Sequence, residues 1–199
     1  MNKLRKIFLT PLVLSLALLY GCAGNSGELP VEPTSKPDAA SGPDTLGASS
    51  SEEEHTPIYI TFEGTDLEGN TVSQDVFSQS KLTMVNVWAT YCNPCLSEMP
   101  FLGELAEEYD TEKFQIIGIV SDVIEGNDQS LAENLVEQTS ANYTHLLLNE
   151  SIYYGLLMDV TAVPTTFFID EDGMLLDTVV GAMKKTAWED KINGLLESL

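Results

Sequence analysis

Two cysteines separated by two residues, Cys92 and Cys95, are the side chains of this sequence best suited to chemistry. They follow an apolar run and precede a segment with helical periodicity, so Cys92 is expected at the N-terminus of a helix. Unpaired N–H groups and the partial positive charge at that terminus stabilise a thiolate, which is the attacking species in thiol–disulfide exchange. The short spacing leaves Cys95 close enough to break a mixed disulfide formed at Cys92. The pair therefore predicts a redox-active disulfide.

Two other uses of these cysteines are weaker interpretations. A structural zinc site needs four ligands, and only His55 and His145 could join the two thiols. His55 lies in a segment that is not expected to fold, so we predict no metal. A purely structural disulfide would close a very small loop and remove little entropy from the unfolded chain.

The segments around the motif alternate between short apolar runs and helical stripes, which is typical of an α/β domain. Residues 82–89 are apolar on both faces except at Asn86, as in a buried central strand. Residues 58–62 and 71–73 flank a turn at 66–70 and predict a β-hairpin. Further strands are expected at 114–120, 144–148, 165–169 and 174–180, and helices after Cys95 and at 131–136, 152–157 and 186–196.

The N-terminus has the pattern of an export signal. Basic residues within the first six positions precede an apolar run over 7–19, which is too short to span a bilayer comfortably. Residues 19–22 then resemble a bacterial lipobox, which predicts a lipoprotein signal peptide over 1–21 and lipidation of Cys22. There are two alternatives: an ordinary secretory signal followed by an incidental cysteine, and a signal anchor.

Residues 22–56 carry several prolines among small and polar residues and almost no large apolar side chains. Such a segment buries too little to offset its ordering entropy, so a disordered linker is expected, followed by one folded domain over 57–199. The chain has 31 acidic and 9 basic residues, a formal net charge of −22. This charge repels phosphate backbones, so nucleic acid is not expected as a partner, and a solvated acidic surface is sufficient to explain it.

Three motifs together resemble the thioredoxin superfamily, and within it the TlpA/ResA-type exported thiol–disulfide oxidoreductases. They are residues 85–95, which include the cysteine pair, residues 98–100, and residues 162–170 with Gly173 beyond them. The resemblance covers about 57–199. It implies a thioredoxin fold with an N-terminal β-hairpin and a central mixed sheet flanked by helices.

The resemblance also implies roles for individual residues. Val163 and Pro164 would dock an extended client segment, with a cis peptide bond before Pro164. Asn86 stands where cytoplasmic thioredoxins carry a buried acid, and Glu98, one helical turn after Cys95, would be the substitute proton acceptor. A solvated helix glutamate is the alternative for Glu98. Trp88 is expected to pack in the core and to form a wall of the substrate-binding site.

The function implied by this family is reduction of disulfides in exported proteins, such as apocytochrome c or methionine sulfoxide reductase, outside the cytoplasmic membrane. Electrons would come from a membrane carrier of the CcdA/DsbD type, and the protein would be a lipid-anchored monomer without a cofactor. A thiol-dependent peroxidase is an alternative, although Val85 and Ala89 stand where its P-x-x-x-[ST]-x-x-C pattern requires Pro and Thr or Ser. A non-catalytic binding lipoprotein is another, and it predicts that both cysteines are replaceable.

Overall fold

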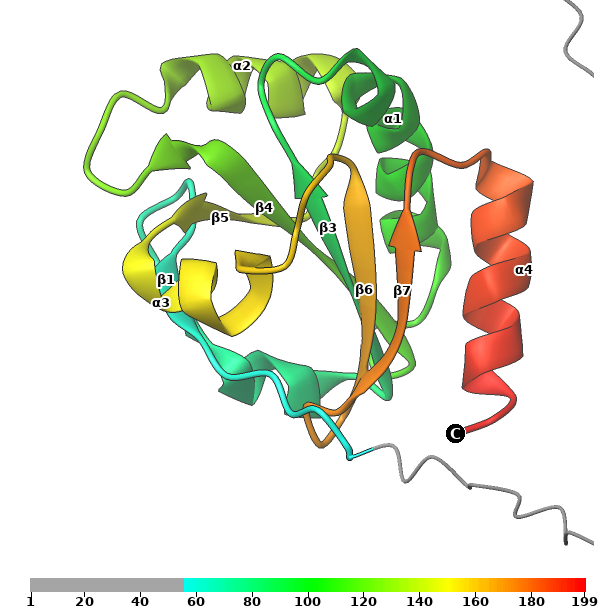
Figure 1. Ribbon diagram of the computed structural model, residues 1–199. Coiled ribbons are helices and arrows are strands. Elements are labelled where there is room, and N and C mark those ends of the chain that lie inside the picture. Colours follow the sequence, from blue (N-terminus) through cyan, green and yellow to red (C-terminus); the bar gives the residue numbers. More distant parts are fainter. Residues whose placement is uncertain (1–55) are drawn as a thin grey trace, which may run out of the picture. The chain divides into compact units, whose positions relative to one another are not determined.

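The computed structural model describes residues 56–199 (Figure 1). The predicted signal peptide over 1–21, Cys22 and nearly all of the predicted linker over 22–56 lie outside the described residues. None of the helices within 56–199 is long and apolar enough to cross a membrane.

A five-stranded sheet forms the centre of the domain, with the strand order β5-β4-β3-β6-β7. The strands are β3 (Leu82–Trp88), β4 (Phe114–Ile124), β5 (Thr144–Leu148), β6 (Thr165–Asp170) and β7 (Leu175–Val180). β3 runs parallel to β4 and antiparallel to β6, β4 runs parallel to β5, and β6 runs antiparallel to β7. The predicted mixed α/β sheet is therefore confirmed.

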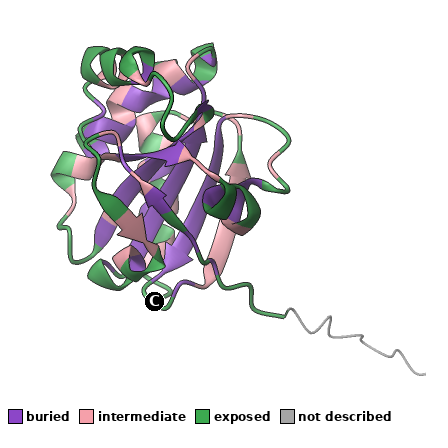
Figure 2. Ribbon diagram, turned by 90° about the vertical axis from the view of Figure 1, so that its left-hand side faces the viewer, coloured by how far each residue is buried: buried purple, intermediate pink, exposed green. Residues whose placement is uncertain are grey.

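The central strands of the sheet, β4, β3 and β6, are buried on both faces over most of their length, as the continuous apolar runs predict (Figure 2). Along β3, Leu82, Met84 and Trp88 face one side, and Val85 and Val87 face the other. Helices α1 (Asn93–Glu108), α2 (Ser130–Thr139) and α4 (Lys185–Leu196) pack on the first side. The short helices η1 (Gln74–Gln79), α3 (Glu150–Ile152) and η2 (Tyr153–Leu157) pack on the second. The domain thus has three layers, and α1 carries the cysteines.

The predicted N-terminal hairpin is present, but its first strand begins later in the chain than the sequence predicts. β1 (Glu63–Thr65) pairs antiparallel with β2 (Thr71–Ser73), and Asp66 closes the turn by accepting hydrogen bonds from the backbone N–H groups of Glu68 and Asn70. Residues 58–60 instead lie beside the start of β7, where the Ile60 N–H donates to the Gly173 carbonyl at 2.8 Å. Burial of Ile60 against the sheet draws this segment away from the hairpin.

Candidate active site

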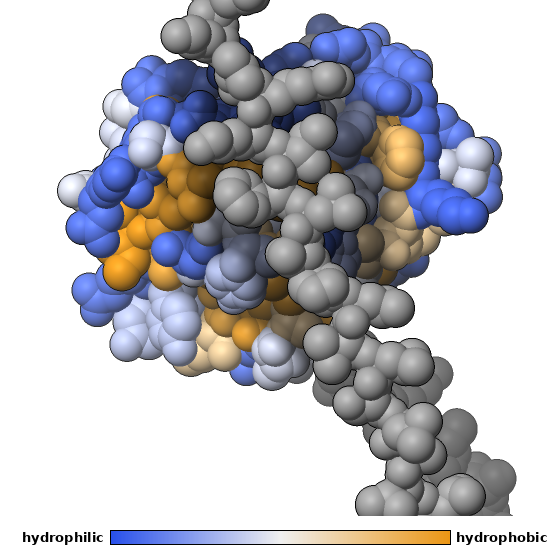
Figure 3. Space-filling model, turned by 90° about the horizontal axis from the view of Figure 1, so that it is seen from above, coloured by the Kyte–Doolittle hydropathy of each residue, from blue (hydrophilic) through white to orange (hydrophobic). Residues whose placement is uncertain are grey.

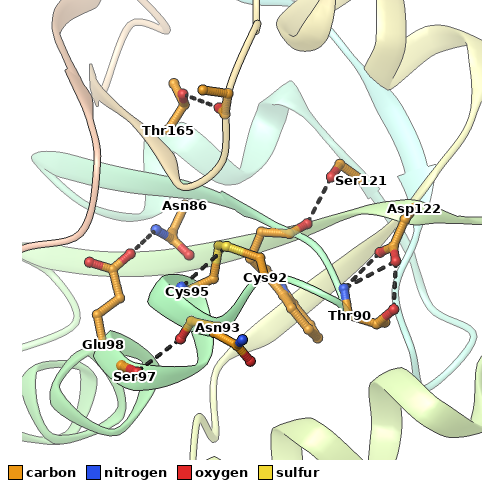
Figure 4. Close-up of a disulfide and its surroundings, with 12 residues drawn as sticks. Asn86, Thr90, Cys92, Asn93, Cys95, Ser97, Glu98, Ser121, Asp122 and Thr165 are labelled. Atoms are coloured by element: carbon orange, nitrogen blue, oxygen red, sulfur yellow. Dashed lines mark hydrogen bonds between the residues drawn. A yellow bond between two sulfur atoms is a disulfide. The ribbon is translucent and has the colours of Figure 1, made fainter. Parts of the chain in front are cut away.

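Cys92 and Cys95 form a disulfide at the N-terminus of α1, with their Cα atoms 5.3 Å apart (Figure 4). Cys92 is the N-cap residue, and its sulfur accepts a hydrogen bond of 3.2 Å from the Cys95 N–H. Pro94 occupies the first turn, where a missing N–H costs nothing. A sulfur at this position faces the positive end of the helix dipole, which favours a thiolate on Cys92 after reduction.

The two sulfur-bearing residues differ in their access to solvent. Cys92 is 6% exposed and Cys95 is fully buried. The neighbouring Tyr91 side chain is 75% exposed, so the chain reaches the surface directly before the disulfide. A second molecule can therefore approach Cys92, whereas Cys95 is reached only from within the protein. This asymmetry assigns attack on a client to Cys92 and resolution to Cys95.

The turn before the disulfide is held by the end of β4. The Asp122 carboxylate accepts hydrogen bonds from the Thr90 N–H at 3.0 Å and from the Thr90 hydroxyl at 2.5 Å. Ser121 donates to the Trp88 carbonyl at 2.9 Å. The sequence places the end of this strand at 120, because the polar pair that follows interrupts the apolar run. The strand in fact continues to Ile124 and so brings Asp122 within hydrogen-bonding distance of Thr90.

Glu98 is buried rather than solvated, since only 1% of the residue is exposed. Its carboxylate accepts three hydrogen bonds: Asn86 Nδ2 donates to Oε1 at 3.1 Å, and the Met183 N–H and Trp188 Nε1 donate to Oε2 at 3.0 and 3.3 Å. Burial raises the pKa of Glu98 above its ordinary value, and the hydrogen bonds from Met183, Asn86 and Trp188 partly oppose the rise. The site therefore contains a buried carboxyl one helical turn from Cys95.

Trp88 does not offer a surface to a client, in contrast to the substrate-binding role predicted for it. The side chain is fully buried, in the same apolar cluster as Cys92 and Cys95. Its indole N–H donates to His145 Nδ1 at 3.1 Å, and His145 Nε2 lies 2.9 Å from the Ala141 carbonyl oxygen. Because Trp88 is a donor, Nδ1 is the acceptor and Nε2 carries the proton of a neutral imidazole. Trp88 thus belongs to the packed core around the disulfide.

His145 makes stability sensitive to acid. Burial lowers its pKa from the model-peptide value of 6.5 to about 4, so the unfolded chain takes up this proton first as pH falls. The contribution of the neutral, buried His145 to the free energy of unfolding is fully present above pH 6.5 and is lost as pH falls to about 4. At 1.36 kcal/mol for each pKa unit, this loss amounts to about 3 kcal/mol. Urea unfolding between pH 7 and 4 should therefore show a steeper loss for the parent than for His145→Leu. Parallel profiles would contradict this assignment.

Val163 and Pro164 lie where the resemblance implies. The Val163–Pro164 peptide bond is cis, and Val163 packs against the apolar cluster that contains both cysteines. The loop that leads into Thr165 passes over the disulfide (Figure 4). A groove of about 250 Å³ adjoins this loop, and its lining includes Tyr91, Tyr153 and Val163.

Sequence reasoning assigned no role to several residues that complete the site. Trp188 and Met183 supply donors to Glu98, and Thr166 accepts a hydrogen bond of 3.1 Å from Asn86 Nδ2. Within residues 56–199, no three His, Cys, Asp or Glu side chains gather in a way that could hold a metal ion. The functional groups that the described structure brings together are the cysteine pair and the buried Glu98 carboxyl, with Asn86 as one of its donors.

Comparison with known proteins agrees with this chemistry. Residues 48–196 match the family model described as Redoxin. The chain is 29% identical over 136 residues to the thiol-disulfide oxidoreductase ResA of Bacillus cereus, covering 68% of this chain and 72% of that protein. It is 27% identical over 199 residues to the thiol:disulfide interchange protein DsbE of Escherichia coli K12, covering 97% and 95% respectively.

Solved structures agree on the fold. A thiol:disulfide interchange protein of the thioredoxin family from Chlorobium tepidum superposes with a TM-score of 0.62 at 22% identity, covering 72% of this chain and 99% of that one. A second protein from Chlorobium tepidum, described as a putative DsbE, gives a TM-score of 0.59 at 23% identity over 70% of this chain and 96% of that one. The chain belongs to the Redoxin family and is a thioredoxin-fold thiol–disulfide oxidoreductase of the TlpA/ResA type, with Cys92 and Cys95 as its redox pair.

Proposed function

We propose that this oxidoreductase works outside the cytoplasmic membrane and reduces disulfides in exported proteins. The proposal rests on the position of the cysteine pair: Cys92 is 6% exposed and follows Tyr91, which lines a largely apolar groove, whereas Cys95 is fully buried. This arrangement suits a second polypeptide better than a small oxidant, because a groove beside the attacking sulfur can hold a length of chain. The signal-like pattern of the N-terminal sequence supports the export part of the proposal.

The groove beside Val163 is proposed to receive the client. Besides Tyr91 and Tyr153, its apolar lining includes Leu157 and Val160. An extended client segment would lie along the Val163 backbone and place apolar side chains against this lining. Viewed from above, the described surface has apolar areas bordered by hydrophilic side chains, as a docking site for an amphipathic segment requires (Figure 3).

The proposed reaction moves two electrons from the dithiol to the client. The Cys92 thiolate attacks one sulfur of the client disulfide, and the other client sulfur leaves as a thiolate that takes up a proton. Cys95 then loses its proton and attacks the Cys92 sulfur, which releases the second client thiol and forms the Cys92–Cys95 disulfide. A membrane carrier of the CcdA/DsbD type would return two electrons and two protons. Apocytochrome c and methionine sulfoxide reductase are the proposed classes of client.

Trapping the cysteines in the cell tests the direction of electron flow. Cells are quenched with acid, free thiols are alkylated, and the two forms of the full chain are separated by mass. A reductase should hold Cys92 and Cys95 mainly as the dithiol, and loss of the membrane carrier should convert the pair to the disulfide. A pair that is oxidised in the presence of the carrier would contradict the proposed direction and leave the exchange chemistry unaffected.

Glu98 is proposed to accept the proton that Cys95 loses during resolution. A buried carboxyl group with a raised pKa suits this task, because its affinity for a proton lies closer to that of a thiol. Its negative charge also disfavours a nearby thiolate, so the titrations of the carboxyl and the thiols are coupled.

Glu98→Gln should separate these effects. Glutamine keeps an acceptor for the Met183 and Trp188 donors, so the fold and the disulfide should be retained. We expect slower resolution of mixed disulfides, by about a hundredfold or more for loss of a proton acceptor, and a pH profile of thiol alkylation displaced to lower pH. Alkylation and turnover that follow the parent between pH 5 and 10, the range that brackets Glu and Cys titration, would contradict the role.

Anchoring is proposed to depend on Cys22. Lipid chains contribute about 0.8 kcal/mol for each buried methylene, so a multiply acylated cysteine would hold the protein at the membrane. The full chain should sediment with membranes, and Cys22→Ser should release it or block removal of residues 1–21. The matched control is Cys92→Ser, which makes the same chemical change and should leave sedimentation unaltered. A Cys22→Ser protein that stays membrane-bound with the parent's mass would exclude lipidation.

A further inference from the structure

The side-chain oxygen of Asn86 has no partner in this disulfide form of the protein. Asn86 is fully buried in β3, and its Oδ1 accepts no hydrogen bond from any residue within 56–199. Its Nδ2 donates to Glu98 Oε1 and to Thr166 Oγ1, each at 3.1 Å. The contact with a carboxylate fixes the amide orientation, because the reverse orientation would bring two acceptor oxygens together.

The unpartnered oxygen faces the redox pair. In Figure 4, the Asn86 amide nitrogen is directed towards Glu98 and the oxygen towards the sulfur atoms at the N-terminus of α1. In the disulfide neither sulfur carries a proton, so neither can donate to this oxygen. A buried acceptor without a donor is unfavourable. If reduction supplies a donor to Asn86 Oδ1, this cost is present only in the oxidised state.

We propose that Asn86 Oδ1 accepts a hydrogen bond from the Cys95 thiol in the reduced protein and thereby stabilises the dithiol relative to the disulfide. Reduction opens the S–S bond with two electrons and two protons, and one of these protons resides on the Cys95 sulfur. That sulfur is buried, so the protein must supply its acceptor. Glu98 assists, since a carboxylate that accepts from Nδ2 polarises the amide and makes Oδ1 a better acceptor.

This contact has a consequence for the reaction. A hydrogen bond donated by the neutral thiol disfavours its loss of a proton, so Cys95 stays protonated while the Cys92 thiolate attacks the client. It also makes the dithiol a weaker reductant than it would be with an apolar residue at position 86. Asn86 thus adjusts the redox equilibrium of the pair through the Cys95 sulfur.

The equilibrium between Asn86→Leu and glutathione tests the proposal. At pH 5.5, about three units below the ordinary cysteine pKa of about 8.5, the ratio of disulfide to dithiol in a fixed glutathione buffer should rise about tenfold in the variant, because the reduced form loses a hydrogen bond and the oxidised form loses an unpartnered acceptor. Thr166→Val is the matched control. It removes the other Nδ2 contact and leaves Oδ1 in place, so its ratio should stay within about twofold of the parent.

An unchanged or lower ratio in Asn86→Leu would overturn the proposal, as would an equal rise in Thr166→Val. A measurement on Asn86 itself does not depend on the folding of the leucine variant. The side-chain carbonyl carbon of Asn86 should resonate further downfield in the reduced parent than in Cys95→Ala, which has no thiol to donate. Identical shifts in the two proteins would equally overturn it.

Discussion

Replacing Cys92 with serine is expected to reduce the dithiothreitol-driven reduction of a model disulfide to the uncatalysed rate, a loss of at least about a thousandfold. The reaction requires a thiolate, and a serine hydroxyl does not ionise at neutral pH. Cys95 cannot take over the attack, because it is fully buried behind Cys92. The loss should therefore be complete rather than partial.

The chain supplies a matched control for this prediction. Cys22→Ser makes the same chemical change far along the sequence from the redox pair, and the purified protein should turn over at the parental rate. Turnover by Cys92→Ser within about tenfold of that control would show that another group attacks the client. If the parent itself showed no turnover above the uncatalysed rate, that result would instead support the interpretation of the protein as a non-catalytic binding lipoprotein whose cysteines are replaceable.

The second large effect is expected from Gly118→Ala, which should lower the free energy of unfolding by about 3 kcal/mol or more. Gly118 lies in β4, opposite Asn86 on one side and His145 on the other. A Cβ atom at Gly118 would come within 2.1 Å of His145 Nδ1, which is too close for any contact. The imidazole would have to move and would leave the Trp88 N–H buried without an acceptor.

Gly194→Ala is the control for the glycine substitution. Gly194 lies within α4, and nothing lies within 4 Å of the position that its Cβ would take. Alanine there should be neutral or should stabilise the helix by up to about 1 kcal/mol. Urea unfolding of both variants at pH 7 measures the difference. A loss below about 1 kcal/mol for Gly118→Ala would mean that His145 has room to move.

The sequence predicts the strands of the sheet and most of the helices that cover it well, because the apolar periodicity of each element is local. It does not predict which polar residues meet across the sheet. Thr166 and Asn86 lie 80 residues apart in sequence, and Trp188 and Glu98 lie 90 apart, yet both pairs are hydrogen-bonded in the core. Because side chains alternate along a strand, Asn86 and Trp88 are expected on the same face of the sheet. No local pattern indicates which residues of other elements contact Asn86 there.

The errors of prediction have the same origin. The run at 58–62 has the composition of a hairpin strand, but the burial of Ile60 and its hydrogen bond to Gly173 decide its place. Trp88 packs in the core, as expected, but His145 and the surrounding cluster enclose it so that none of its side chain is exposed to a client. Glu98 is not among these errors, because a solvated helix glutamate is only the alternative for it; its burial follows from partners on α4 and the loop before it, distant in sequence.

Attack by Cys92 and resolution by Cys95 are tested by the reaction of Cys95→Ser and of Cys92→Ser with glutathione disulfide, followed by intact mass and peptide mapping. We expect a stable glutathione adduct on Cys92 in Cys95→Ser, and in Cys92→Ser a reaction of the buried Cys95 that is at least about tenfold slower. Equal rates in the two variants, or an adduct that forms faster on Cys95, would contradict these roles.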